Sequence, residues 1–263
     1  MVKSDPADGG GRKQQIADAF GRAARSYDDA AAPQRQAAAL VADLAAQQRL
    51  PERPRILEVG CGTGILTRHI RAHWPDADLV ASDLSPDMVG QAARGAMIAG
   101  TFLSMDGEVP PFDGPWFDLI LSSLAFQWFS DLPTAIERLA GLLRPGGSLF
   151  FSTMGADSFA EWRAAHAAVG ESAGTPDYPD LAALRSMLAT FPDAFAFDEH
   201  WDHDFGGAKG FLAHLKGIGA TVPTGDHAVL TPARLRSVMT AFNTTGGTVT
   251  YHILFGRVTR IAA

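Results

Sequence analysis

The most informative stretch of the sequence is Arg55-Ile56-Leu57-Glu58-Val59-Gly60-Cys61-Gly62-Thr63-Gly64. A short apolar run leads directly into alternating glycines, which predicts a buried parallel strand that turns tightly into a helix at residues 65–73. Backbone without side chains also allows a ligand to approach closely. The pattern therefore predicts a ligand-binding loop, with a structural turn that binds nothing as the alternative.

The spacing of the glycines distinguishes this loop from the dinucleotide-binding pattern G-x-G-x-x-G. The third glycine, Gly64, comes one residue early, and Glu58 stands two residues before Gly60. A carboxylate there would repel a pyrophosphate and attract a cationic sulfonium ligand that carries an amino-acid tail. Cys61 lies between the glycines, where we expect a small residue that fits a tight loop; a reactive thiol is the alternative.

Strand and helix patterns alternate along the first half of the chain, as they do in parallel, doubly wound sheets. The predicted strands are residues 55–59, 78–82, 100–105, 117–122, 148–153, 194–205 and 248–259. In the second half, helical patterns occupy residues 158–169, 181–191, 211–219 and 232–242. This order predicts an α/β fold with a doubly wound, mostly parallel seven-stranded sheet and a helical lid or insertion in the C-terminal half.

The chain has 263 residues, of which 46% are hydrophobic, so it can form one large domain. Residues 1–12 are polar and glycine-rich, which predicts a disordered tail. We expect a single domain at 13–263. Within it, N-terminal helices at 13–48 precede a ligand-binding core at 53–155 and substrate-side helices and final strands at 156–263.

Charge and cysteine content exclude several classes of function. The net charge is −7, whereas nucleic-acid-binding proteins usually carry a strongly basic surface. A single cysteine cannot form an internal disulfide or a multi-cysteine metal site, and the sequence shows no metal-ligand cluster and no Ser-His-Asp order. No stretch is apolar enough for a signal peptide or a membrane span. We therefore expect a soluble, cytoplasmic protein that binds no metal, nucleic acid or membrane.

Two aspartates follow the strands that neighbour the glycine loop. Asp83 ends the second strand, where an acidic residue meets ribose hydroxyls in doubly wound nucleotide sites; an acid in the first turn of a helix is the alternative. Asp106-Gly107 follows the third strand, and an adenine amino group is its expected partner, with a plain Asp-Gly turn as the alternative. Leu84 and Met88 are further candidates for ligand contact.

Together with the turn Leu143-Arg144-Pro145-Gly146-Gly147, these motifs resemble the class I S-adenosylmethionine-dependent methyltransferases over residues 50–155. The resemblance implies S-adenosylmethionine as the cofactor. It also implies roles for these residues: Gly60, Gly62 and Gly64 around the methionine part, Glu58 in support of the loop, Asp83 on the ribose, Asp106 on adenine, and Ser122 and Ser123 at the reacting centre.

Nearly the whole chain resembles a narrower family, the malonyl-carrier-protein O-methyltransferases of biotin synthesis (the BioC family). The motifs are Lys13-Gln14-Gln15-Ile16-Ala17, residues 19–24, Tyr27, residues 123–128, residues 212–220 and Thr250-Tyr251-His252. This resemblance implies methyl esterification of the free carboxylate of a malonyl thioester, on an acyl-carrier protein or coenzyme A. The chain is also similar to a mitochondrial complex I assembly factor with a methyltransferase fold, so an assembly role is one alternative. Methylation of another small acid or a phenol is a second.

The implied reaction needs no general base, because a carboxylate with an unperturbed pKa of about 4 is already ionised at neutral pH. Carboxylate and sulfonium neutralise each other as the methyl moves, so a tightly paired arginine would stabilise the ground state more than the transition state. We therefore expect neutral donors, or an offset cation, near the attacking oxygens. The acceptor-positioning candidates are Tyr27, Gln127, Trp128, His214 and Lys216. The alternative for Tyr27, Gln127 and Trp128 is ordinary packing without a role in binding. The alternative for His214 and Lys216 is a solvated helix face.

A carrier protein that is itself acidic would need a local basic patch on this acidic chain. Two arginine pairs at helical spacing are candidates, Arg22 with Arg25 and Arg68 with Arg71. Solvated arginines without a partner are the alternative for both pairs.

Overall fold

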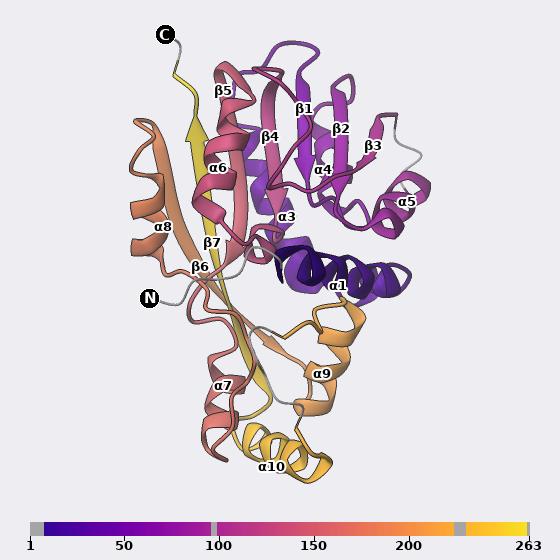
Figure 1. The fold of residues 1–263 in the computed structure, drawn as a ribbon, viewed down its shortest axis with the longest axis vertical. Coiled ribbons are helices and arrows are strands. Elements are labelled where there is room, and N and C mark those ends of the chain that lie inside the picture. The colour runs from indigo at the N-terminus through magenta and orange to yellow at the C-terminus, as the bar shows by residue number, and fades with distance from the viewer. Residues whose placement is uncertain (1–7, 96–98, 224–229, 262–263) are drawn as a thin grey trace.

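The computed structural model describes residues 8–95, 99–223 and 230–261. Its seven-stranded sheet has the order β3-β2-β1-β4-β5-β7-β6 (Figure 1). The strands are β1 (Arg55–Val59), β2 (Asp78–Asp83), β3 (Thr101–Ser104), β4 (Phe117–Ser123), β5 (Leu143–Met154), β6 (Ala194–Asp204) and β7 (Thr248–Thr259). The first five strands pair in parallel, and β7 pairs antiparallel with both β5 and β6. The prediction of a mostly parallel α/β sheet is confirmed.

Helices cover both faces of this sheet (Figure 1). They are α1 (Asp8–Ala23), α2 (Tyr27–Ala30), α3 (Ala32–Ala45), α4 (Ile65–His73), α5 (Pro86–Gly95), α6 (Leu132–Gly141), α7 (Ala160–Ala167), α8 (Leu181–Leu188), α9 (Ala208–Gly217) and α10 (Pro232–Asn243), with a 3-10 turn η1 (Phe126–Trp128). Val41 of α3 and Ile70 of α4 belong to one apolar core, and Ile136 of α6 and Leu184 of α8 to a second. Among the described residues, no helix has the length and apolar character needed to span a membrane.

The last two strands extend the sheet past the carboxyl ends of β1, β2 and β4 and carry a lower group of helices (Figure 1). Trp162 of α7 lies with its ring centroid 5.4 Å from that of Phe211 in α9 and 5.4 Å from that of Phe242 in α10. Helix α1 lies between this group and the edge where the parallel strands end. The helical insertion predicted for the C-terminal half therefore stands opposite the glycine loop.

The predicted disordered tail at 1–12 needs a correction, because α1 already begins at Asp8. Residues 1–7 lie outside the described residues. Three consecutive glycines have low helix propensity, but Ile16 and Ala17 are buried further along the same helix. Tertiary packing therefore overrides the local preference.

The fifth strand also begins earlier than predicted, at Leu143 instead of residue 148. Phe117 pairs with Leu143, and the next pair is Leu119 with Ser148, so the four residues 144–147 of β5 stand opposite the single residue Asp118 of β4. A Cβ on Gly147 would lie 3.0 Å from the carbonyl oxygens of Arg144 and Asp118. The predicted turn is therefore an irregularity inside the strand, held by close backbone contacts.

Candidate active site

The glycine loop leaves β1 in a conformation that favours glycine. Gly60, Gly62 and Gly64 have φ angles of +77°, +53° and +90°. A Cβ on Gly60 would lie 2.3 Å from the Cβ of Ala125, whereas one on Gly62 would meet nothing within 4 Å. Gly60 therefore allows close packing against the segment after β4, and Gly62 leaves open space at the loop.

Asp83, at the end of β2, joins the second strand to this loop. Its Oδ2 accepts a hydrogen bond from the Gly62 N–H at 2.9 Å, and its Oδ1 accepts one from the Ser85 N–H at 2.8 Å. Burial raises the pKa of this carboxyl, and the backbone hydrogen bonds oppose that shift. Each oxygen keeps a lone pair with which it can accept a further hydroxyl proton.

Glu58 is fully buried beneath the loop. Its Oε2 accepts a hydrogen bond from the Thr67 hydroxyl at 2.6 Å, whereas its Oε1 has no partner among the described residues. Burial raises the pKa of Glu58 to about 8. A cation close to the loop would stabilise the ionised form of Glu58 through its electric field.

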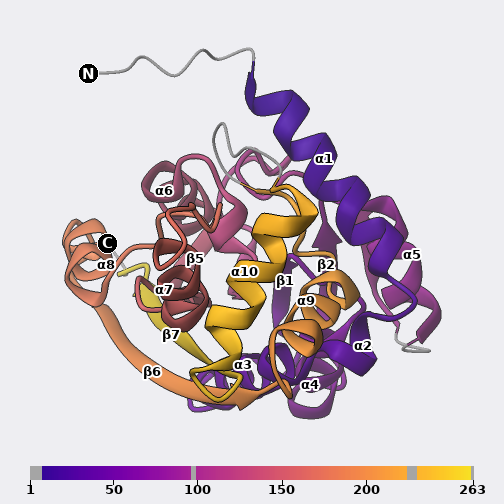
Figure 2. The same ribbon diagram turned by 90° about the horizontal axis from the view of Figure 1, so that it is seen from below.

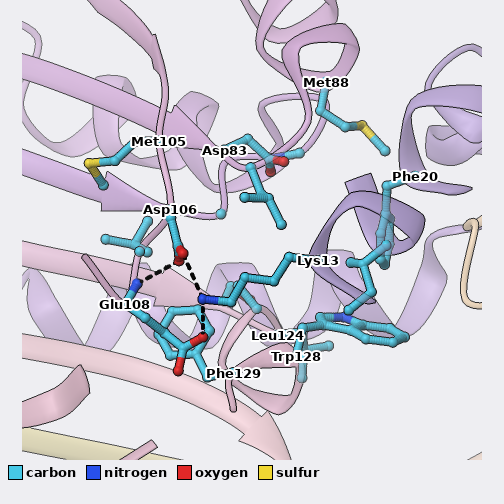
Figure 3. Close-up of a pocket in the computed structure, with 18 of the residues that line it drawn as sticks. Lys13, Phe20, Asp83, Met88, Met105, Asp106, Glu108, Leu124, Trp128 and Phe129 are labelled. Atoms are coloured by element: carbon cyan, nitrogen blue, oxygen red, sulfur yellow. Dashed lines mark hydrogen bonds and ion pairs between the residues drawn. The ribbon is translucent and has the colours of Figure 1, made fainter. Parts of the chain in front are cut away.

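A charged group from α1 reaches the loop after β3 (Figure 3). The Lys13 ammonium lies 2.6 Å from Asp106 Oδ2 and 2.6 Å from Glu108 Oε2. Glu108 is buried, and its Oε1 accepts the backbone N–H groups of Ser130 and Asp131 at 2.9 and 2.8 Å. Lys13 therefore ties α1 to the loop after β3 and, through Glu108, to the start of α6.

These groups surround a cavity of about 100 Å³ (Figure 3). The predicted site residues that line it are Gly60, Gly62, Asp83, Leu84, Met88, Asp106, Gly107, Ser123, Tyr27 and Trp128. Glu58, Cys61, Gly64 and Ser122 are not in the lining. Glu58 and Cys61 lie buried behind it, and Ser122 donates a hydrogen bond to the Val59 carbonyl at 2.8 Å, which joins β4 to β1. We call this space the cofactor cavity.

A second cavity, of about 430 Å³, lies between α1 and the lower group of helices. It shares Phe20, Tyr27, Leu124 and Trp128 with the cofactor cavity, so the two spaces meet at these side chains. None of the described residues in its lining is Lys, Arg, Asp or Glu. Its volume falls within the roughly 300–1,000 Å³ that is usual for small-molecule sites. We call it the acceptor cavity.

The chain has three tyrosines, and all of them line the acceptor cavity. Burial raises the pKa of Tyr27, Tyr178 and Tyr251, so their hydroxyls stay protonated at neutral pH. No hydrogen bond joins the Tyr27 or Tyr178 hydroxyl to a residue that the structure describes. Arg163 and Arg12 exert a positive field on Tyr178 without lining the cavity. The cavity therefore offers neutral phenol donors, with no Lys or Arg among the described residues of its lining.

Leu124 separates the two cavities and has an unusual backbone conformation, with φ at +50°. Its N–H donates to the Ser152 carbonyl and hydroxyl, both at 3.1 Å, and its carbonyl accepts the Gln127 Nε2 at 2.6 Å. Contacts on both sides of the residue hold this strained geometry in place, as is common at functional sites. Gln127 and Trp128 are thereby positioned at the wall of the acceptor cavity.

The last two acceptor candidates lie elsewhere on α9. His214 is buried, and its ring lies 2.9 Å from the Ala30 carbonyl through Nδ1 and 2.5 Å from the Tyr251 hydroxyl through Nε2. Burial lowers its pKa to about 4, so it is neutral at physiological pH. His214 supports Tyr251 without lining the cavity. The alternative that His214 lies on a solvated face of its helix is wrong, because the side chain is buried. Lys216 is exposed and is not in the lining.

The sequence-based predictions missed several lining residues, among them Lys13, Phe20 and Tyr178. Lys13, Ile16 and Phe20 share one face of α1, because they are spaced three and four residues apart. That spacing was a usable signal. Tyr178 lies in an irregular segment with no periodic pattern, so no local signal pointed to it.

Comparison with known proteins agrees with this geometry. A family model described as a methyltransferase domain matches residues 29–191. The chain is 40% identical to a malonyl-[acyl-carrier protein] O-methyltransferase of Magnetococcus marinus, over 95% of this chain and 94% of that protein. It is 43% identical to a biotin biosynthesis bifunctional protein of Bordetella avium, over 93% of this chain and 52% of that protein, so it spans about half of that relative.

A solved structure also resembles the fold, that of phosphoethanolamine N-methyltransferase 2 of Haemonchus contortus in complex with S-adenosyl-L-methionine. The TM-score is 0.58 at 15% identity, over 89% of this chain and 56% of that one, so the likeness concerns the fold alone. The family model and the relatives matched over nearly their full length identify the family. This chain belongs to the S-adenosylmethionine-dependent methyltransferases, in the family that contains the malonyl-[acyl-carrier protein] O-methyltransferases.

Proposed function

We propose that this protein transfers a methyl group from S-adenosylmethionine to the free carboxylate of a malonyl group carried on an acyl-carrier protein. The observation that carries the proposal is the junction of the two cavities at Phe20, Tyr27, Leu124 and Trp128. One cavity borders the glycine loop, and the other is largely apolar with neutral polar groups. A donor and an acceptor held in the two cavities would face each other at this junction. The relatives named for this activity support the choice of acceptor.

The residues around the cofactor cavity fit S-adenosylmethionine. When bound, the cofactor supplies an electrophilic methyl group on a sulfonium. The free lone pairs of Asp83 suit the ribose hydroxyls, and Asp106 suits the adenine amino group once Lys13 is displaced or shared. Glu58 lies buried behind the lining, so it would act on the positive charge of the methionine part through its field and not by contact. Gly60 and Gly62 present bare backbone to it.

The lining of the acceptor cavity suits a carboxylate nucleophile. The malonyl carboxylate is ionised at neutral pH and therefore needs orientation and water exclusion from the protein, but no proton transfer. Because its charge disappears as the methyl moves, neutral phenol donors favour the transition state over an ion pair with arginine. Tyr27, which lines both cavities, orients the attacking oxygen in this proposal, and Gln127 and Trp128 shape the wall beside it.

The experiment is a methyl-transfer assay with labelled S-adenosylmethionine and the purified protein. Malonyl-carrier protein, malonyl-coenzyme A and free malonate are offered at equal concentrations. We expect a base-labile methyl ester on malonyl-carrier protein, at a much higher kcat/KM than on free malonate. A protein that binds the cofactor but esterifies none of the three acceptors would contradict the proposal, and an equal rate on free malonate would assign it to small acids.

A further inference from the structure

We propose that an acidic carrier protein docks on the exposed face formed by α9, α10 and the end of α1. This inference rests on the proposed function, because it assigns the surface through which that function receives its substrate. The five residues that define the surface, here called the basic cap, are Arg22, Arg25, Lys209, Lys216 and Arg236. All five are exposed, and none forms an ion pair or side-chain hydrogen bond with a residue that the structure describes.

The charge of the basic cap contrasts with that of the whole chain. Residues 205–223 and 230–250 carry Lys209, Lys216, Arg234 and Arg236 and contain no Asp or Glu, although the chain has a net charge of −7. Arg234 is engaged by Glu171 at 3.2 Å, which leaves the other three side chains available. Asp28 and Asp29, just beyond the end of α1, are also exposed, and Asp28 is paired with Arg68. A surface with an excess of one sign on a protein of the opposite net sign attracts partners that the rest of the molecule repels.

The basic cap borders the acceptor cavity. On α9, Lys216 follows Leu215, which lines the cavity, and Thr221 and Pro223 line it from exposed positions just beyond the helix. On α10, Arg236 follows Leu235, another lining residue. A thioester arm that enters past this edge would therefore come from a partner seated on α9 and α10.

The end of α1 belongs to the same surface (Figure 2). The Ser26 hydroxyl lies 3.4 Å from the Gly217 carbonyl, and a Cβ on Gly219 would lie 2.8 Å from the Ala19 carbonyl oxygen. These contacts bring the last turn of α1 against the end of α9. Arg22 and Arg25, three residues apart on α1, extend the basic cap toward the junction of the two cavities.

The other candidate patch, Arg68 with Arg71, is not available to a partner. Arg68 pairs with Asp28 at 3.1 Å, and Arg71 donates to the carbonyls of Pro75 and Ala77 at 3.1 and 2.8 Å. Both guanidinium groups are therefore occupied within the protein. Of the two arginine pairs that the sequence offered, Arg22 with Arg25 is the one available to a partner.

The test compares two double charge reversals with a matched control. The variants are Arg22→Glu/Arg25→Glu and Lys209→Glu/Arg236→Glu. The control, Arg49→Glu/Arg53→Glu, changes the net charge by the same amount on exposed residues at the opposite edge of the sheet, before β1. Initial rates are measured on malonyl-carrier protein and on malonyl-pantetheine, which carries the same thioester without the protein or its charge.

We expect both double variants to raise the KM for malonyl-carrier protein about tenfold or more, and added salt to reduce the difference. Rates on malonyl-pantetheine, and those of the control on both acceptors, should change less than about twofold. Unchanged KM values for malonyl-carrier protein would overturn the docking surface, as would an equal loss on malonyl-pantetheine. The unsubstituted protein separates the two proposals: if it esterifies neither acceptor, the proposed function itself fails.

Discussion

Asp83 is the residue whose geometry most directly predicts a binding defect. Its two oxygens already hold the backbone at Gly62 and Ser85 and still face the cofactor cavity. Asp83→Ala should weaken cofactor binding about a hundredfold, because hydrogen bonds to a charged group contribute about 1.5–3 kcal/mol each. Titration calorimetry measures the affinity, with the exposed Asp76→Ala as the control. Unchanged affinity would remove Asp83 from the site.

The raised pKa of Glu58 predicts that cofactor binding is linked to proton release. Its pKa of about 8 lies above the ordinary value of 4.5, so the carboxyl is mostly protonated at pH 7. A bound cation favours the ionised form, and binding at pH 7 should therefore release a proton into the buffer. Calorimetry in two buffers of different ionisation enthalpy measures this release. Glu58→Gln should abolish it, and equal enthalpies for the unsubstituted protein would contradict the assignment.

The same residue predicts the pH dependence of stability without cofactor. Between about pH 4.5 and 8 the folded protein holds a proton on Glu58 that the unfolded chain has lost. The contribution of this residue to the free energy of unfolding is therefore greatest below pH 4.5, falls as pH rises toward 8, and is constant above it. Glu58→Gln should flatten that part of the stability curve, as measured by urea unfolding across the pH range.

Helix α1 is the element on which access to the cofactor cavity depends. The cavity of about 100 Å³ is smaller than most small-molecule sites, and Lys13 closes it by pairing with Asp106 and Glu108. Lys13→Met should loosen α1, because it leaves a buried carboxylate without its cation. We expect amide hydrogen exchange in α1 and the cofactor dissociation rate each to rise about tenfold. The exposed Gln15→Met, of similar helix propensity, should change neither.

In the complete fold, the two cavities have different walls, because α7, α9 and α10 contribute lining residues to the acceptor cavity and none to the cofactor cavity. Trp162 packs with Phe211 and Phe242 in the lower group of helices, and it lines the acceptor cavity but not the cofactor cavity. Trp162→Ala should lower the free energy of unfolding by about 3–5 kcal/mol and raise the KM for the acceptor. Cofactor affinity measured below the melting transition should stay within a few-fold. Trp116→Ala, at a half-exposed position, is the control, and an equal loss of cofactor affinity in Trp162→Ala would show one coupled unit.

The parts of the fold that could be predicted are those that local pattern encodes. β1 and α4 have the bounds that were predicted, because an apolar run, φ-positive glycines and helical spacing are all short-range features. The prediction of disorder up to residue 12 was wrong because the start of α1 depends on long-range contacts. Its three glycines suggest disorder, and only the distant partners of the helix show why it forms.

Local sequence patterns were enough to predict the strands, the helices and the glycine loop, because these depend on residues within a few positions of one another. The class of cofactor followed from the family resemblance carried by that loop together with Asp83 and Asp106. The three-dimensional structure was needed to show that Lys13 meets Asp106 across 93 residues, that His214 supports Tyr251, and that three tyrosines share one cavity. It also separated the available arginine pair from the occupied one. These outcomes depend on how helices from both ends of the chain pack against the carboxyl edge of the sheet, and no local pattern records that packing.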